Sequence, residues 1–233
     1  MTHPVAQAAI ALRLLVCLTL GAFALALPAL RGRDNQLPAR VPYVFPEPGT
    51  DAVADSIRAR RAGGVLLDLD GALLNAPLIA ASWNAIAGVI RDNNTIPADM
   101  RELLILRTAV LNDAAYQWGE HESVGRAAGL TTSHLRTLRL APPYAGLADP
   151  SSSAARALKS TLSPQLAAAV DFADWSTGAV RIPQGVYDRL HAHLNNEQMV
   201  EAISTVGFYN FVSRFTVGLD LDSEANVPVP IPS

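Results

Sequence analysis

Apolar residues recur at three- and four-residue spacing along most of the chain, a pattern typical of helices that bury one face. After Pro77 this spacing predicts a helix whose core face carries Leu78, Ile79, Trp83, Ile86, Ala87 and Ile90. From Pro97 to Trp118 nearly every side is apolar, which predicts a central helix that is buried around most of its circumference. No segment shows the alternation of a strand over a useful length, so the sequence predicts an all-α bundle.

Capping and helix-breaking residues set the bounds of the other predicted helices. Thr50 or Asp51 can cap a helix that runs to about Arg61, and the segment TTSHLRTLRL opens with residues suited to capping. Further helices are expected over residues 163–175, 184–193 and 197–219, after prolines or a pair of asparagines. A weak internal repeat is also visible, because Met-Arg-Glu at 100–102 followed by Asn112 resembles Met-Val-Glu at 199–201 followed by Asn210.

The domain layout predicted from composition has four parts. Residues 1–30 contain a continuous apolar run from Leu14 to Leu30, flanked by arginines, which predicts a signal peptide or a membrane anchor. We therefore expect a protein of the secretory pathway, either secreted or attached to a membrane through residues 14–30. Residues 31–50 form a proline-rich linker and domain entry, 51–222 the helical domain, and 223–233 a proline-rich tail.

Charge and cysteine content exclude two classes of function. The 233-residue chain has a formal net charge of -3 and Lys159 is its only lysine, so no basic stripe for nucleic acid is expected. The only cysteine, Cys17, lies in the apolar N-terminal run. The helical domain can therefore form neither an internal disulfide nor a cysteine-ligated metal site.

The segment PADMRELLILRTAVLNDAAYQWGEHESVGRAAGL resembles the core motif of the carboxymuconolactone decarboxylase/alkylhydroperoxidase D-like family. The likeness extends from about Arg40 to about Asp222, and it implies the alkylhydroperoxidase D-like helical bundle. In the redox-active branch of the family, two cysteines and a histidine follow a glutamate at fixed spacing. Here the glutamate and histidine are Glu102 and His121, but Ala114 and Gln117 occupy the cysteine positions. The resemblance therefore implies no thiol peroxidase activity.

Glu102 and His121 are the candidate catalytic residues. A carboxylate on an apolar helix needs a partner or a raised pKa, and a histidine exchanges protons near neutral pH. An unbroken helix would hold the two residues far apart, so we expect it to end near residues 111–113 and fold back around one cavity. Tyr116, Trp118, Asn112 and Arg107 are the candidate substrate-binding residues.

These residues predict a cofactor-independent, decarboxylase-like lyase or isomerase that acts by acid/base chemistry on a small organic acid or lactone. No metal or organic cofactor is implied. The alternative is a non-catalytic scaffold of the same fold, in which Glu102 pairs with Arg107 or another arginine and the aromatic residues belong to the core. In either case a chain this apolar is expected to form a homo-oligomer.

A minor alternative rests on the segment VLLDLDGALL at 65–74, which resembles the first motif of haloacid dehalogenase-like phosphatases. Asp68 would be the nucleophile and Asp70 the acid of such an enzyme. That chemistry requires a parallel sheet and a downstream acidic metal pair, and the remaining sequence predicts neither.

Overall fold

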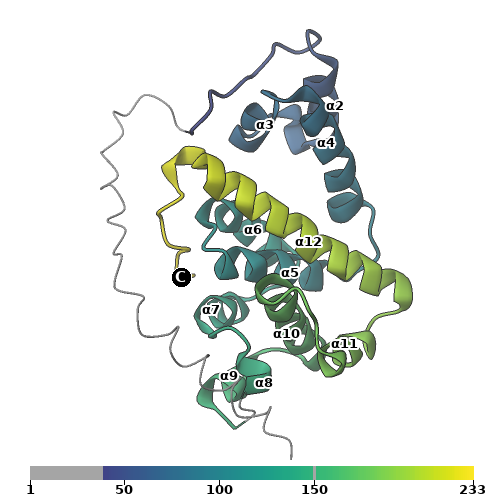
Figure 1. The fold of residues 1–233 in the computed structure, drawn as a ribbon, viewed down its shortest axis with the longest axis vertical. Helices are drawn as coiled ribbons and strands as arrows, with labels where there is room; N and C mark the ends of the chain where they lie inside the picture. The colour runs from purple at the N-terminus through teal and green to yellow at the C-terminus, as the bar shows by residue number, and fades with distance from the viewer. Residues whose placement is uncertain (1–38, 149–150) are drawn as a thin grey trace, which may run out of the picture. The chain divides into compact units, whose positions relative to one another are not determined.

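The computed structural model describes residues 39–148 and 151–233 (Figure 1). Every regular element in this described part is helical, which confirms the predicted all-α class. The α-helices are α2 (Ala52–Arg60), α3 (Asp68–Leu73), α4 (Pro77–Asp92), α5 (Ala98–Leu111), α6 (Ala115–Ala127), α7 (Thr132–Leu140), α8 (Ala145–Ala148), α9 (Ser153–Thr161), α10 (Pro164–Gly178), α11 (Gln184–His191) and α12 (Asn196–Leu219). Two short 3₁₀ helices, η1 (Ala62–Gly64) and η2 (Leu221–Ser223), complete the set.

Helix α5 lies at the centre of the bundle, as its apolar sequence predicts. It packs against α6, α10 and α12, and Figure 1 shows the long α12 crossing over α5 and α6. Every residue from Glu102 to Ala109 is buried. A helix enclosed in this way holds any polar side chain it carries away from bulk water, so its charged residues need partners within the protein.

The predicted break after α5 is present. Helix α5 ends at Leu111, Asp113 takes a left-handed conformation with φ 49°, and the Ala114 amide donates to the Ala109 carbonyl at 2.9 Å. Aspartate tolerates this conformation better than most residues. The chain thus reverses, and α6 returns along α5.

Gly125 allows α6 to lie close to α5. A Cβ atom at this position would come within 2.9 Å of a Leu106 methyl carbon and 3.6 Å of the Cβ of Glu102. Any larger residue would push the two helices apart at the level of Glu102.

The predicted caps explain where the outer helices begin. Asp51 accepts hydrogen bonds from the amides of the first turn of α2, Thr131 from that of α7, and Ser163 from that of α10. Helix α9, capped by Ser152, is an element that the sequence analysis did not predict.

The predicted core face of α4 is partly wrong. Leu78, Ile79 and Ile86 are exposed, with 86% of Leu78 accessible to solvent. The buried side carries Ala80, Trp83, Ala87 and Ile90. Helix α4 packs against α2 and α12, and only the side that faces these two helices is buried. The larger aliphatic residues lie beside this buried side and remain exposed.

The proline-rich segment before α2 has no helix in its described residues, yet it packs on the domain. The Arg40 amide donates to the Leu219 carbonyl at 2.7 Å, and the Val44 amide to the Gly71 carbonyl at 2.9 Å. The tail is also held, since Arg139 donates to the Val229 carbonyl at 2.7 Å. The described ends of the chain are thus part of the helical domain.

The predicted localisation is corrected. Within residues 39–148 and 151–233, no helix is both long enough and apolar enough to cross a membrane. The longest, α12, carries Glu197, Glu201 and Arg214. The apolar run at 14–30, on which the signal peptide or anchor was predicted, lies outside the described residues, so the secretory assignment has no structural support.

The phosphatase alternative is wrong. The segment that would have to end a strand instead forms α3, and no strand occurs in the part of the chain that the structure describes. Asp70 is buried and forms a bidentate ion pair with Arg61, with N–O distances of 2.7 and 2.9 Å. It also accepts a hydrogen bond from the Leu67 amide at the start of α3. Its carboxylate is therefore fully engaged in holding α2 and α3 together.

A second ion pair, fully buried, ties α5 to α10. Arg107 Nε donates to Asp174 Oδ1 at 2.6 Å, and the remaining guanidinium nitrogens donate to Asp174 Oδ2 and to the carbonyls of Leu138, Ala141 and Pro142. Both side chains are at most 1% exposed. Every charge is thereby matched by a hydrogen bond, as burial of an ion pair requires.

Removing one partner of this pair should be costly. Arg107→Met leaves the Asp174 carboxylate buried without its cation, and we expect the free energy of unfolding in urea to fall by about 3–5 kcal/mol. Replacing both residues, as in Arg107→Met with Asp174→Leu, should restore much of the loss. Arg181→Met, at an exposed arginine, is the control and should change little. A loss below about 1 kcal/mol for the single variant would contradict this account.

Candidate active site

The two candidate catalytic residues meet where α6 returns along α5. His121 Nδ1 and Glu102 Oε2 are 2.8 Å apart, and the residues are 4% and 1% exposed. The sequence separation of nineteen residues is therefore closed by the helical hairpin, as the predicted break requires. Their catalytic role stays a prediction.

The environment favours an ionised glutamate beside a neutral histidine. Burial alone would raise the pKa of Glu102, but the hydrogen bond from His121 and neighbouring arginine charges hold it below its ordinary value. For His121, burial is the strongest influence and lowers its pKa, which the hydrogen bond to Glu102 offsets only in part. An ionised carboxylate can only accept a hydrogen bond, so the imidazole proton lies on Nδ1.

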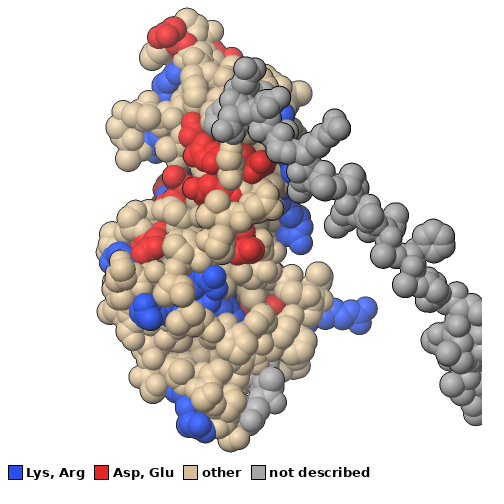
Figure 2. Space-filling view, turned by 90° about the vertical axis from the view of Figure 1, so that its left-hand side faces the viewer, with Lys and Arg blue, Asp and Glu red and all other residues tan. Residues whose placement is uncertain are grey.

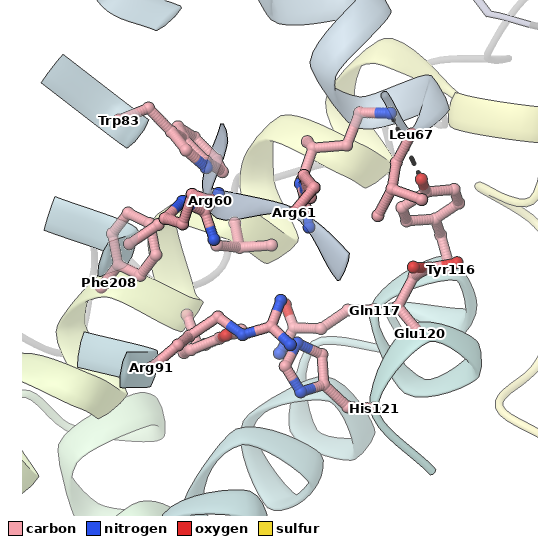
Figure 3. A pocket seen from close by; sticks show the side chains of 14 residues that line it. Arg60, Arg61, Leu67, Trp83, Arg91, Tyr116, Gln117, Glu120, His121 and Phe208 are labelled. Atoms are coloured by element: carbon pink, nitrogen blue, oxygen red, sulfur yellow. Dashed lines mark hydrogen bonds between the residues drawn. The ribbon is translucent and has the colours of Figure 1, made fainter. Parts of the chain in front are cut away.

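The other ring nitrogen of His121 is thus an unprotonated acceptor. No described residue forms a hydrogen bond with Nε2, and His121 is among the residues that line a cavity between α2, α4, α6 and α12 (Figure 3). The cavity volume is about 40 Å³. This is room for a few water molecules, and a larger ligand would require side chains of the wall to move.

Three arginines make one wall of this cavity positive. Figure 3 shows Arg60 and Arg61 on one side, Gln117 and His121 on the other, and Arg91 extending toward His121. Arg61 is neutralised by Asp70 and Arg60 donates to Asn84 at 2.7 Å, but no described residue bonds or pairs with Arg91. Burial, together with the charges of Arg61 and Arg91, lowers the pKa of Arg60. Guanidinium groups crowded in this way favour an anionic ligand.

Tyr116 lies on the cavity wall, and its role in substrate binding stays a prediction. Its hydroxyl accepts the Leu69 amide at 3.2 Å, and burial is the main cause that raises its pKa. Glu120, one turn along α6, also lines the cavity. Tyr116 therefore links the start of α3 to α6.

The two positions where the redox-active branch has cysteines carry structural residues. Ala114 is fully buried, and Gln117 donates to the Ile105 carbonyl at 3.0 Å while accepting from Ser213 at 2.8 Å. Gln117 lines the cavity and ties α5, α6 and α12 together. Thiol chemistry has no residue to act through at these positions.

Three of the predicted substrate-binding residues do not reach the cavity. Arg107 is buried against Asp174, as described above. Trp118 is fully buried and donates to Glu122 at 2.7 Å, and Asn112 donates to Asn210 of α12 at 3.0 Å. These contacts stabilise the bundle, and Asn112 lines a separate surface pocket together with Arg214 of α12. The contact between Asn112 and Asn210 joins the two halves of the predicted internal repeat.

Sequence reasoning missed the residues that complete the site. Arg60, Arg91 and Tyr209 come from α2, α4 and α12, none of which belongs to the motif around Glu102. Arg91 and Tyr209 had one sequence signal, since each is a polar group on a helix that is otherwise largely apolar. Only the packing of the helices shows that both residues line the same cavity as His121.

Acidic side chains gather on one face of the molecule (Figure 2). Two of these carboxyl groups, Asp68 and Glu224, have a raised pKa, first because of burial and then because of the nearby Asp222. Across the described ranges no three His, Cys, Asp or Glu side chains are arranged to hold a metal ion.

With this geometry in place, comparison with known proteins shows what the chain is similar to. Residues 77–160 match the model of the carboxymuconolactone decarboxylase family, which confirms the resemblance predicted from the sequence. The matched segment contains Glu102, His121 and Arg91. No curated protein matches the chain in sequence.

Two solved structures are similar in fold. A complex of a cysteine-to-alanine variant of the debrominase Bmp8 with 2,3,4-tribromopyrrole gives a TM-score of 0.58 at 12% identity, covering 77% of this chain and 89% of that one. A protein of unknown function from Agrobacterium tumefaciens, a candidate antioxidant defence protein AhpD, gives 0.52 at 18% identity, covering 68% and 94%. At these identities the likeness shows the alkylhydroperoxidase D-like fold alone.

The Glu102–His121 pair predicts how stability depends on pH. Because the folded-state pKa of His121 lies below 6.5, the unfolded chain takes up a proton first as pH falls, and the free energy of unfolding should decrease below pH 6.5. Glu102 acts in the same direction below pH 4.5, because its folded-state pKa is also lowered. Urea unfolding between pH 7.5 and 4 should show this decrease.

His121→Gln should make the pH dependence between 6.5 and 5 shallower. His193→Gln, at an exposed histidine, is the matched control and should leave the slope unchanged. A slope that is the same in wild type and His121→Gln would contradict the assignment of a neutral buried histidine.

Proposed function

We propose that this protein catalyses cofactor-independent proton transfer on a small organic acid or lactone, as a lyase or isomerase of the carboxymuconolactone decarboxylase type. His121 is the general base and Glu102 the residue that orients it. The observation that carries this proposal is the free Nε2 of a buried histidine whose Nδ1 is held by a carboxylate, at the wall of a cavity.

The pair can move a proton without a metal or an organic cofactor. Neutral His121 accepts a proton from a substrate carbon at Nε2, and the resulting imidazolium is stabilised by the Glu102 carboxylate. Returning that proton to a different carbon completes an isomerisation. In the lyase route the C–C bond to a substrate carboxylate breaks and CO₂ leaves. The electron pair stays on the substrate as an enolate, and a proton that His121 has taken up from water is then delivered from Nε2 to carbon.

The charge of the cavity supports an anionic substrate. Arg91 forms no hydrogen bond or ion pair with a described residue, and Arg60 lines the same cavity, so a carboxylate could bind both. The arginines are partly exposed, and displacement of their long side chains could enlarge the cavity. The debrominase neighbour, solved with a small halogenated pyrrole, supports a fold that accepts small organic molecules.

The scaffold alternative has one observation in its favour, because the cavity of about 40 Å³ is smaller than an organic acid. A scaffold would have no need of an unpaired arginine and an unprotonated imidazole nitrogen at the same cavity. The two proposals differ in whether any substrate is turned over.

The pH dependence of turnover tests the assignment of His121 as a base. Hydrogen–deuterium exchange at carbon, followed by NMR across a set of small oxo acids and lactones, would identify a substrate. We expect kcat/KM to rise with pH, with a midpoint below 6.5, because burial lowers the pKa of His121. His121→Gln should lose about a hundredfold or more in rate.

His193→Gln serves as the matched control and should retain full activity. A rate that instead falls as pH rises through this range would show that a protonated group starts the reaction. Absence of exchange with every compound would leave the scaffold as the better account.

We also propose that the protein forms a homo-oligomer through an apolar surface on α4 and α12. This surface comprises Leu78, Ile79, Ile86, Val89, Val200, Ile203 and Phe211, all of which are exposed. Trp83 contacts Phe211 at a ring-centroid distance of 4.8 Å, so the two helices present their apolar residues side by side. Such a patch is typical of a surface that is covered in the assembled protein.

Charge placed on this surface should break the assembly. Light scattering on a chain that begins at Gln36 should give more than the monomer mass, and the variant with Leu78→Asp and Val89→Asp should give the monomer mass. Val180→Asp, at an exposed valine outside the surface, is the control. A monomeric unmodified chain at micromolar concentration would contradict the proposal.

A further inference from the structure

The hydroxyl of Tyr209 has no hydrogen-bond partner in the described protein, although the residue as a whole is buried. The residue is 2% exposed and lines the cavity. Buried tyrosine hydroxyls normally find a partner. A hydroxyl left open at a cavity wall therefore points to a partner that enters the cavity.

The position of Tyr209 relative to the base is defined. Its ring meets the His121 ring edge to face, with centroids 4.9 Å apart and planes at 88°. Burial is the main cause that raises the pKa of Tyr209, so the phenol keeps its proton and acts as a hydrogen-bond donor. The phenol ring thus packs against the ring of the proposed base, and both residues line the same cavity.

Arg91 adds a positive charge at the same place. Arg91 lines the same cavity as Tyr209 and extends toward His121 (Figure 3), and its charge influences the pKa of Tyr209, His121 and Glu102. Arg61 and Arg60 are held by Asp70 and Asn84, whereas no described residue holds Arg91. The N–H groups of Arg91 are therefore available to donate hydrogen bonds to a ligand.

We propose that Tyr209 and Arg91 together form an oxyanion site, which binds the enolate oxygen that develops when His121 removes a proton from the substrate. This inference rests on the proposed function and names the substrate class more closely. The substrate must carry its acidic C–H next to a carbonyl, so that negative charge moves onto an oxygen beside Tyr209 and Arg91.

The step balances within the site. The C–H electron pair becomes a carbon–carbon π bond as the proton moves to His121 Nε2, and the carbonyl π pair moves onto oxygen. The Tyr209 hydroxyl and an Arg91 N–H donate hydrogen bonds to that oxygen but transfer no proton. When carbon is reprotonated from Nε2, the electrons return and the carbonyl is restored.

Binding of 4-nitrophenolate, a stable anion with a delocalised oxygen charge, tests the site without turnover. Titration followed by absorbance should show that wild type binds it and lowers the apparent pKa of the bound phenol. Tyr209→Phe and Arg91→Met should each weaken binding about tenfold or more, as expected for loss of a hydrogen bond to a charged group. Tyr187→Phe, at an exposed tyrosine outside the cavity, should bind as wild type does.

Stability separates a binding role from a structural one. Since the Tyr209 hydroxyl has no partner in the described protein, Tyr209→Phe should leave the free energy of unfolding close to that of wild type even as binding falls. A destabilised Tyr209→Phe would show that the hydroxyl serves the fold. Undetectable binding by wild type, or equal binding by wild type and Tyr209→Phe, would overturn the inference.

His121→Gln distinguishes this inference from the proposed function. The variant should retain binding of 4-nitrophenolate within a few-fold, because the oxyanion donors remain, yet lose carbon-bound hydrogen exchange. Binding that depends on Tyr209 without any exchange activity in wild type would refute the proposed function and leave the anion site standing. Hydrogen exchange at carbon that is as fast in Tyr209→Phe as in wild type would refute the oxyanion site and leave the proposed function standing.

Discussion

The hydrogen bond between Glu102 and His121 is the interaction on which the site depends. A carboxylate 1% exposed on the central helix requires a donor, and the 2.8 Å contact with His121 Nδ1 supplies it. The same bond fixes the imidazole tautomer, so the unprotonated Nε2 is available at the cavity. A requirement of folding, to satisfy a buried charge, therefore also orients a base.

The surrounding bundle keeps that contact in place. The turn at Asp113 reverses the chain, and Gly125 lets α6 approach α5. The buried Arg107–Asp174 pair anchors the other side of α5 to α10. Each of these features lies outside the cavity, yet a displacement of α5 or α6 would separate Glu102 from His121.

Much of this arrangement could be predicted from local sequence, because caps, prolines and apolar periodicity act over a few residues. The hairpin that joins Glu102 to His121 followed from the polar residues that interrupt an apolar helix. A core position for Trp118 was one of the alternatives that the sequence left open, whereas the partner of Arg107 could not be predicted, since Asp174 lies far along the chain. Arg91 and Tyr209 were missed for the same reason, and the exposure of Leu78 depends on which helices flank α4.

The protonation state of His121 is the most direct test of this account. Nitrogen-15 NMR of the imidazole distinguishes an N–H nitrogen from an unprotonated one and a neutral ring from an imidazolium. At pH 7 we predict a neutral ring with the proton on Nδ1 and a bare Nε2, and in Glu102→Gln the tautomers should become mixed. An imidazolium at pH 7, or a wild-type ring protonated on Nε2, would contradict the account.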